Sequence, residues 1–284
     1  MIICIVGPTG VGKTKLSVEL AKKYDAIIIN CDAMQVYKGL DIGTAKATLE
    51  ERQGIEHYLL DFVDVRKNYT VADYQKDARK ILEENKHRNI IFVGGTGLYL
   101  KAALWDYRFL EEENLESYEE YSNEELYQLC LKKNSSCEIH PNNRKRMIRF
   151  LQRKEESPKA TPLYDAIYIG LTTDKERLYS IINHRVDEMM ENGLLEEVKS
   201  FYDQNIHSKA LETAIGYKEL YAYFNHECDL EEAIDKIKQN SRHYAKRQYT
   251  FFRHQLPVKW VDVDYENFDH TISFVENYIN QKQA

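Results

Sequence analysis

The sequence predicts an α/β fold of the P-loop NTPase-like type, in which helices flank a parallel β-sheet, with a small helical insertion subdomain. An apolar segment at residues 2–6 runs directly into the glycine-rich residues 7–14, and this order of strand and loop is typical of a P-loop. Two further apolar segments, residues 26–30 and 90–93, also end in polar or glycine-rich residues. Because parallel strands bring their carboxyl ends to one edge of a sheet, we expect a ligand site at that edge.

The other elements follow from hydrophobic periodicity and from helix-capping residues. Residues 13–24 continue the P-loop as a helix, and Thr70 with Asp73 forms a capping-box pattern that opens a helix to about residue 85. The remaining predicted elements are, in chain order, a loop at residues 37–46, a strand at 167–171, a helix at 174–192 ended by Gly193, a helix from Asp229 to about Gln255 with Glu232 in its cap, and a strand at 258–263. Strands that alternate with helices favour a parallel sheet.

Residues 107–161 differ from the rest of the chain in composition. They are polar, helix-like and rich in Glu and Lys, and Pro158 and Pro162 close the stretch. Proline is common just beyond the end of a helix. We therefore predict a helical insertion subdomain at residues 107–161, and a P-loop core made of residues 1–106 and 162–284.

Length and composition exclude several classes of protein. The 284 residues are 43% hydrophobic and 30% charged, which is ordinary for a globular protein with one large or two modest domains. No apolar run approaches the roughly 18 residues that a membrane span requires, and we expect no cleavable signal, no membrane partner and a cytoplasmic location. The five cysteines lack metal-ligand spacing, which suits a reducing compartment and gives no zinc site.

Charge is segregated along the chain. The net charge of −7 alone argues against nucleic acid, and the charged residues between 109 and 131 are all acidic. Those from 140 to 154 and from 236 to 261 are all basic. Two sets of residues recur there at helical spacing, namely Arg146, Arg149 and Arg153, and Arg242, Lys246, Tyr249 and Arg253. Each set can line a helix face that binds a polyanion, with Tyr249 as a modest platform for stacking a base, although a solvated face is the commoner explanation of one basic run.

Each part of the P-loop has a chemical role. Successive backbone N–H groups and the helix N-terminus hold a diphosphate or triphosphate, Lys13 adds a positive charge, and Thr14 offers a hydroxyl ligand to Mg²⁺. The alternative is a glycine-rich turn that only links a strand to a helix, but the strand before it and the helix after it favour phosphate binding. The predicted phosphate-binding residues are Gly7, Pro8, Thr9, Gly10, Val11, Gly12, Lys13 and Thr14.

Asp32 and Thr96 follow two predicted strands, at the edge where the P-loop lies. Asp32 can be a Mg²⁺ ligand, a base or orienting group for an acceptor, or a helix cap with no chemical role. Thr96 follows Gly94 and Gly95, whose small size lets a backbone approach a ligand closely. Thr96 can also be a turn residue or the N-cap of a helix that begins near Gly97, and the two uses are compatible.

Six stretches of the sequence resemble the tRNA dimethylallyltransferases, also called tRNA isopentenyltransferases, in their bacterial form without a C-terminal zinc finger. They occur in the order found in that family and cover nearly the whole chain. The second and third of them are highly specific together, whereas the P-loop alone is generic. The stretches are residues Gly7 to Thr14, Asp32 to Lys46 (DAMQVYKGLDIGTAK), Gly94 to Tyr99 (GGTGLY), Ile139 to Asn142 (IHPN), Ala214 to Glu219 (AIGYKE) and Ala245 to Gln248 (AKRQ).

The resemblance implies transfer of a dimethylallyl group from dimethylallyl diphosphate to N6 of the adenosine immediately 3′ of a tRNA anticodon. It implies that Thr9 to Thr14 hold the diphosphate, that Asp32 accepts a hydrogen bond from N6, and that Thr96 contacts the reacting nucleotide. The predicted catalytic residues are thus Asp32, Thr96 and Lys13, with Mg²⁺ as cofactor. The residues expected to contact tRNA, from the resemblance and the two basic faces, are Asp32, Ala33, Met34, Gln35, Thr96, Lys145, Arg146, Arg149, Thr213, Gly216, Tyr217, Lys218, Arg242 and Lys246.

The residues themselves agree with this chemistry. Adenine N6 is a poor nucleophile because its lone pair is delocalised into the ring, so a carboxylate has to orient it and take its proton. The diphosphate leaves as a polyanion, which Lys13, Mg²⁺ and the loop amides stabilise as charge develops. The base must also leave its stack to reach the allylic carbon.

Three other functions are compatible with parts of the pattern. A small-molecule kinase also combines a P-loop with an Asp at the end of the second strand, but it does not need the two basic helix faces. An adenylate isopentenyltransferase would modify a free nucleotide. A non-catalytic RNA-binding protein explains neither Asp32 nor Thr96. We expect the tRNA anticodon stem-loop and dimethylallyl diphosphate as partners, no DNA, and a monomer.

Overall fold

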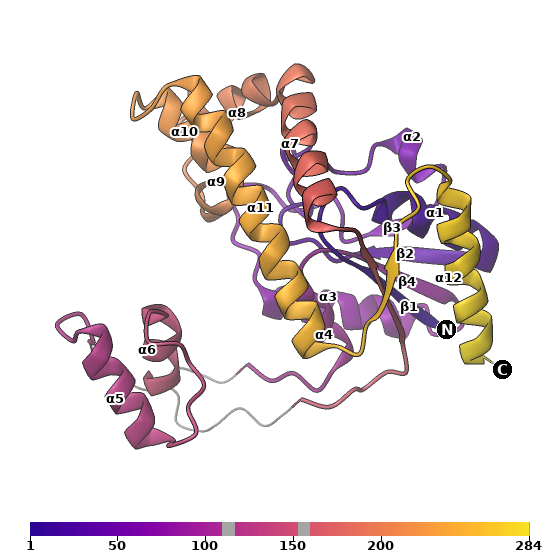
Figure 1. Ribbon diagram of the computed structural model, residues 1–284, viewed down its shortest axis with the longest axis horizontal. Coiled ribbons are helices and arrows are strands. Elements are labelled where there is room, and N and C mark those ends of the chain that lie inside the picture. The colour runs from indigo at the N-terminus through magenta and orange to yellow at the C-terminus, as the bar shows by residue number, and fades with distance from the viewer. Residues whose placement is uncertain (110–116, 153–159, 284) are drawn as a thin grey trace. The chain divides into compact units, whose positions relative to one another are not determined.

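Figure 1 shows the computed structural model, which describes residues 1–109, 117–152 and 160–283. Contacts within the chain divide it into two compact units. The larger consists of Met1–Trp105 and Pro162–Ala284, and the smaller of Asp106–Thr161. The larger unit carries the sheet, and α5 and α6 belong to the smaller one (Figure 1).

The elements of the described residues alternate as a parallel α/β fold requires. The strands are β1 (Ile2–Val6), β2 (Ala26–Asn30), β3 (His57–Tyr58), β4 (Asn89–Gly94), β5 (Ile167–Thr172) and β6 (Lys259–Asp262). The helices are α1 (Lys13–Tyr24), α2 (Leu49–Arg52), α3 (Val71–Glu84), α4 (Gly97–Leu104), α5 (Asn123–Lys133), α6 (Arg144–Gln152), α7 (Lys175–Glu191), α8 (Leu194–Asp203), α9 (Lys209–Thr213), α10 (Tyr217–Phe224), α11 (Leu230–Gln255) and α12 (Phe268–Gln283).

The sheet has six strands in the order β3-β2-β4-β1-β5-β6, and every pair is parallel. This confirms the predicted fold class. Strands β2, β4 and β1 are neighbours, and their last residues stand in register, with Asn30 opposite Val93 and Val6 opposite Gly94. The P-loop, Asp32 and Thr96 follow these three strands and therefore meet at one edge of the sheet, as the sequence predicts.

Both faces of the sheet are covered by helices. Along β1, Ile3 and Ile5 pack on one side in a core shared with α1, α7 and α12, whereas Cys4 and Val6 pack on the other side with α3, α4 and α11. Successive side chains of a strand point to opposite faces. Burial on both faces explains why the strands are almost uninterrupted apolar runs.

Capping residues predicted the helix starts well. Thr70 and Asp73 form the reciprocal capping box that opens α3, and Asp229 and Glu232 do the same for α11. Two elements were not predicted from the sequence. They are β3, which has only two residues, and α12, the last helix of the chain. Gly193 follows α7 as expected, and it is also the N-cap of α8. Its φ of 96° lies in the left-handed region, which glycine adopts readily, so the chain changes direction there within one residue.

The smaller unit has its own core. Leu126, Cys130 and Met147 are fully buried between α5 and α6, and Ser122 with Glu125 forms the capping box of α5. Arg144, at the start of α6, donates hydrogen bonds to the backbone oxygens of Tyr118, Glu119 and Tyr121. In the parts of the chain that the structure describes, no helix has the length and apolar content to cross a membrane.

Candidate active site

A cavity of about 480 Å³ opens at the carboxyl edge of the sheet. Its walls come from the P-loop, the segments after β2 and β4, the loop before α2, and helices α7, α10 and α11. The residues predicted from the sequence that line it are Thr9, Gly10, Gly12, Lys13, Thr14, Asp32, Ala33, Met34, Gln35, Thr213, Gly216 and Lys218. The structure thus brings the predicted donor-binding and acceptor-binding residues to one space.

The P-loop is shaped by its glycines. Gly7 has φ 137°, and a Cβ on it would lie 2.6 Å from the carbonyl oxygen of Leu171. Gly12, with φ 84°, turns the chain directly into α1, so the first N–H groups of this helix point toward the loop. Gly7, Pro8 and Val11 are buried and do not line the cavity; they support the loop, and the other P-loop residues offer their groups to a ligand.

Lys13 is a half-buried cation that lines the cavity. Its Nζ donates a hydrogen bond of 2.5 Å to the carbonyl oxygen of Pro8. Burial, and then the positive charge of Arg185, lower the pKa of Lys13 to about 7, while the negative charge of Asp32 acts in the opposite direction. An ammonium group held under these conditions is stabilised by any anion that enters.

Arg185 is a second cation beside the P-loop, which the sequence did not predict. It lies in α7 and lines the cavity, and its Nη1 donates to Oγ1 of Thr9 at 3.0 Å. Burial lowers the pKa of its guanidinium. In the described residues neither Arg185 nor Lys13 forms an ion pair with a carboxylate. Two cations without carboxylate partners in the described residues favour an anion at this end of the cavity.

Asp32 uses one carboxylate oxygen for structure and keeps the other. Its Oδ1 accepts the backbone N–H groups of Met34 at 2.9 Å and Gln35 at 3.4 Å. Oδ2 accepts no hydrogen bond from the described residues, and Asp32 lines the cavity. Residues 33–36 form a turn and not a helix, so the helix-cap alternative weighed from the sequence is wrong; Oδ1 holds this turn, and Oδ2 remains for chemistry.

Thr96 immediately precedes α4, but its side chain does not cap the helix. Its Oγ1 instead accepts the backbone N–H of Ala33 at 3.0 Å, so Thr96 occupies the predicted N-cap position without a capping hydrogen bond from its side chain. Thr96 is not among the residues that line the cavity. Its hydroxyl ties the end of β4 to the turn that carries Asp32.

Tyr244 and Gln248, both of α11, close the cavity above Asp32 and were not predicted from the sequence. Burial, and then the charge of Asp32, raise the pKa of the Tyr244 hydroxyl. Hydrogen bonds with Thr96 and Gln248 act in the opposite direction and lower this pKa. Gln248 is buried, its Nε2 donates to the carbonyl oxygen of Gly95 at 3.1 Å, and its Oε1 has no partner in the described residues. Gln248 is the last residue of the stretch Ala245 to Gln248 that resembles the family, but no role was predicted for it.

Two tyrosines that were predicted to contact nucleic acid pack against other residues of the chain. The Tyr217 side chain is fully buried and donates its hydroxyl proton to Glu197, so it supports the fold and does not present itself to tRNA. Tyr249 packs on Trp260 with ring centroids 5.3 Å apart and shares a hydrogen bond with Thr172. The expected stacking platform at Tyr249 is therefore wrong.

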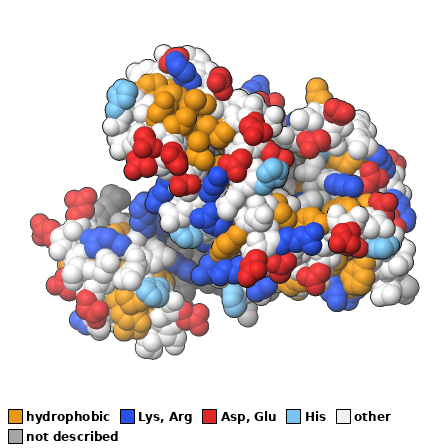
Figure 2. All heavy atoms as spheres, turned by 45° about the horizontal axis from the view of Figure 1, so that its top comes forward, with side chains coloured by type: hydrophobic (Ala, Val, Ile, Leu, Met, Phe, Trp, Pro, Cys, Tyr) orange, Lys and Arg blue, Asp and Glu red, His pale blue; other side chains and the backbone are white. Residues whose placement is uncertain are grey.

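Basic side chains remain exposed on two helices. On α6, Lys145, Arg146 and Arg149 are exposed, and Arg153 lies outside the described residues. On α11, Lys246 is exposed, while Arg242 donates to Oδ1 of Asn183 at 2.5 Å and lies over the Tyr179 ring. Figure 2 shows several acidic side chains, together with a few basic ones, around the hydrophobic patch in the part of the molecule that holds α8 and α10.

The chain has full-length relatives of known name. The family model described as IPP transferase matches residues 35–255. A tRNA dimethylallyltransferase of Anoxybacillus flavithermus is 44% identical over 99% of this chain and 96% of its own length. One of Bacillus subtilis is 44% identical over 92% of this chain and 90% of its own length. The P-loop and Asp32 precede the residues that the family model matches, so the full-length relatives extend the likeness to them.

Solved structures agree with the fold. The full-length tRNA isopentenylpyrophosphate transferase of Bacillus halodurans has a TM-score of 0.78 and 41% identity, covering 99% of this chain and 96% of that one. A eukaryotic dimethylallyltransferase acting on tRNA has a TM-score of 0.80 and 28% identity, covering 99% of this chain and 79% of that one. With sequence, fold and cavity in agreement, the chain belongs to the IPP transferase family, together with these tRNA dimethylallyltransferases.

Proposed function

We propose that this enzyme transfers a dimethylallyl group from dimethylallyl diphosphate to N6 of the adenosine immediately 3′ of a tRNA anticodon, releasing diphosphate. The names of its relatives support a tRNA substrate and this transfer. The observation that carries the proposal is the arrangement of the cavity, with the cations Lys13 and Arg185 at the P-loop and the unengaged oxygen of Asp32 in the same space.

At the donor end, the diphosphate lies against the P-loop amides, Lys13 and Arg185. Charge on the leaving diphosphate increases as the allylic C–O bond breaks, so fixed cations stabilise the transition state more than the ground state. Burial strengthens this effect because little water screens the charges.

Mg²⁺ is part of the same proposal. Thr14 lines the cavity, and the described residues hold no cluster of three or more His, Cys, Asp or Glu side chains. A single hydroxyl fits Mg²⁺, which is usually bound by few protein groups together with phosphate oxygens and water. When bound, the ion neutralises negative charge on the diphosphate.

At the acceptor end, Asp32 orients the amino group of adenine. Its Oδ1 is fixed by the two backbone N–H groups, so Oδ2 is held in place to accept a hydrogen bond from N6–H. As N6 attacks the allylic carbon it gains positive character, and the carboxylate then takes the proton. The adenosine has to leave its stack to enter the cavity, and the exposed cations of α6 and α11 hold the tRNA backbone.

The direct test incubates the enzyme with dimethylallyl diphosphate and unmodified total tRNA, and in a parallel reaction with dimethylallyl diphosphate and AMP. The dimethylallyl product is measured in each reaction. ATP with small hydroxyl acceptors serves as the kinase control. We expect product with tRNA alone. A product with AMP and none with tRNA would support the free-nucleotide enzyme, and phosphoryl transfer from ATP would support the kinase.

Donor affinity should depend on pH through Lys13. Its pKa of about 7 means that the free enzyme loses this cation as the pH rises above 7. Binding of dimethylallyl diphosphate should therefore weaken from pH 7 to pH 9, by up to about tenfold per pH unit, until the pKa of the complex is reached. Calorimetry in the absence of tRNA measures this affinity.

The Arg185→Met variant is the internal control for that titration. Removing the neighbouring positive charge raises the pKa of Lys13, so the loss of affinity should begin at a higher pH, on top of a weaker overall affinity. Constant donor affinity between pH 7 and pH 9 in the unmodified enzyme would exclude Lys13 as the titrating group.

tRNA affinity should be strongly salt-dependent. Phosphate contacts release counterions, so affinity should fall by about 10- to 100-fold between about 50 and about 200 mM salt. Arg146→Gln and Lys246→Gln should each reduce the slope of log K against log salt by about 0.7 to 0.9. Lys80→Gln on α3, where Lys80 is exposed and pairs with Glu84, is the matched control. Equal slopes in all variants would mean that these side chains are only solvated.

A further inference from the structure

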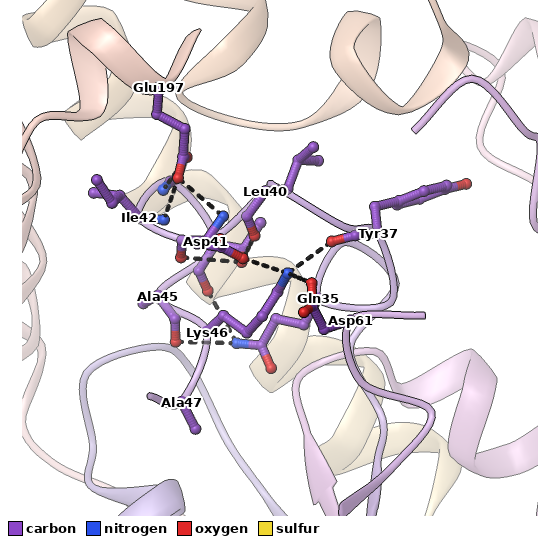
Figure 3. A network of polar contacts seen from close by, with 12 residues as sticks. Gln35, Tyr37, Leu40, Asp41, Ile42, Ala45, Lys46, Ala47, Asp61 and Glu197 are labelled. Carbon is purple, nitrogen blue, oxygen red and sulfur yellow. Dashed lines mark hydrogen bonds and ion pairs between the residues drawn. The ribbon is translucent and has the colours of Figure 1, made fainter. Parts of the chain in front are cut away.

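The loop between Tyr37 and Ala47 forms one wall of the cavity without being helix or strand. Gly43, Thr44, Ala45 and Ala47 line the cavity. Such a segment needs anchors, because its backbone groups have no regular partners of their own. Figure 3 shows that side chains from outside the loop supply them.

Glu197 of α8 is the main anchor. Its Oε2 accepts the backbone N–H groups of Asp41 at 3.1 Å and Ile42 at 2.8 Å, and its Oε1 accepts the N–H of Gly43 at 3.2 Å (Figure 3). Oε1 also accepts the hydroxyl proton of the buried Tyr217. One carboxylate therefore takes four donors, two on each oxygen.

Close packing supports the same contact. A Cβ on Gly43 would lie 2.6 Å from Cε2 of Tyr217 and 3.0 Å from Cδ1 of Leu194. The loop backbone thus rests directly on the side chains of α8 and α10. Any residue larger than glycine here has to move the loop away from Glu197.

The far end of the loop is held by Lys46, whose side chain is 4% exposed. Its Nζ donates to the carbonyl oxygen of Tyr37 at 2.7 Å and forms ion pairs with Asp41 at 2.5 Å and Asp61 at 2.6 Å (Figure 3). The ammonium group has three N–H donors, and these three acceptors use them all. Lys46 fixes the loop ends, and Glu197 fixes its tip.

The anchored loop leads to Asp32 in two hydrogen-bonded steps. The carbonyl oxygens of Thr44 and Ala45 accept from Nε2 of Gln35 at 3.0 and 3.2 Å (Figure 3). The backbone N–H of Gln35 in turn donates to Oδ1 of Asp32. Nε2 of Gln35 has both hydrogens engaged in this way, so the side chain is oriented by the loop.

We propose that Glu197 is a positioning residue for the acceptor side of the cavity, which holds the loop and Gln35 in the form that receives the tRNA nucleoside. This inference rests on the proposed function. In the described residues Glu197 makes no hydrogen bond to the P-loop, Lys13 or Arg185, so its loss should affect tRNA and not the donor. Asp32 keeps its bond from Met34, so the chemical step is affected less than tRNA binding.

The Glu197→Gln variant is the sharpest test. An amide has one oxygen, so its NH₂ group faces either the N–H groups of Asp41 and Ile42, or the N–H of Gly43 and the Tyr217 hydroxyl, which can turn to accept; in both orientations at least one backbone N–H of the loop loses its acceptor. We expect the Kd and KM for tRNA to rise about tenfold or more, because the loop loses hydrogen bonds to a charged group. The Kd for dimethylallyl diphosphate should stay within about twofold of its value in the enzyme without this substitution. A twofold change in Kd corresponds to less than about 0.5 kcal/mol.

Glu196→Gln is the matched control, because Glu196 is exposed on the same helix and makes no hydrogen bond to the loop in the described residues. Hydrogen exchange gives a second readout, since the amides of Asp41, Ile42 and Gly43 should exchange faster in Glu197→Gln and unchanged in Glu196→Gln. Should Glu197→Gln fail to fold, Gly43→Ala pushes the same loop away from α8, α10 and Glu197 and should raise the tRNA Kd with donor affinity intact.

Accelerated exchange with an unchanged tRNA Kd would overturn the proposal, and so would a donor Kd that rises as much as the tRNA Kd. The binding and exchange measurements need no turnover. If the enzyme without substitutions binds tRNA but forms no dimethylallyl product, the proposed function is contradicted. The binding test of Glu197 remains valid in that case.

Discussion

Replacing Asp32 by Asn should lower the single-turnover rate at saturating donor by about 10²- to 10⁴-fold, the usual contribution of a general base. The structure makes this substitution unusually selective. Asn retains an oxygen for the N–H groups of Met34 and Gln35, which Oδ1 of Asp32 now accepts. It removes the charge and basicity of Oδ2 alone, so the donor KM should change little.

A magnesium series separates the two chemical roles of Asp32. If Asp32 were mainly a Mg²⁺ ligand, Asp32→Asn would weaken donor binding and excess Mg²⁺ would restore the rate. We expect no rescue. Asp174→Asn is the control, because Asp174 caps α7 and Asn caps a helix equally well. Full rescue by metal would rule out the base assignment.

Lys13→Ala should lower kcat by about 10²-fold or more, as is typical when one group that stabilises transition-state charge is removed. Arg185 is close enough to lower the pKa of Lys13, but it stays in place in this variant, so only the charge of Lys13 is lost. Lys22→Ala, at the exposed end of the same helix, should turn over normally. Steady-state kinetics with both variants measure the contrast, and near-normal turnover of Lys13→Ala would contradict the P-loop assignment.

Local sequence patterns were sufficient for the frame of the fold. The P-loop, the capping boxes of α3 and α11, and the apolar strand runs each depend on residues within a few positions of one another. The shared edge of the strand ends followed from the general behaviour of parallel strands, whereas the order β2-β4-β1 came from the structure.

Tertiary contacts could not be read in the same way. Arg185 lies 176 residues from Thr9 in the sequence, and nothing in α7 distinguishes it from other helical arginines until the fold brings it to the P-loop. Tyr217 and Tyr249 looked available for RNA because aromatic residues serve both stacking and packing, and only burial separates the two uses. The anchoring role of Glu197 likewise depends on α8 meeting a distant loop.

The central claim is that one cavity joins a dimethylallyl donor to one adenosine of tRNA. The most direct measurement is incubation of the enzyme with dimethylallyl diphosphate and a single unmodified tRNA, followed by nuclease digestion and mass analysis of each fragment. We predict one added dimethylallyl group, on N6 of the adenosine immediately 3′ of the anticodon, and almost none with Asp32→Asn in the same time. Modification at another nucleotide, or equal product with Asp32→Asn, would contradict the account.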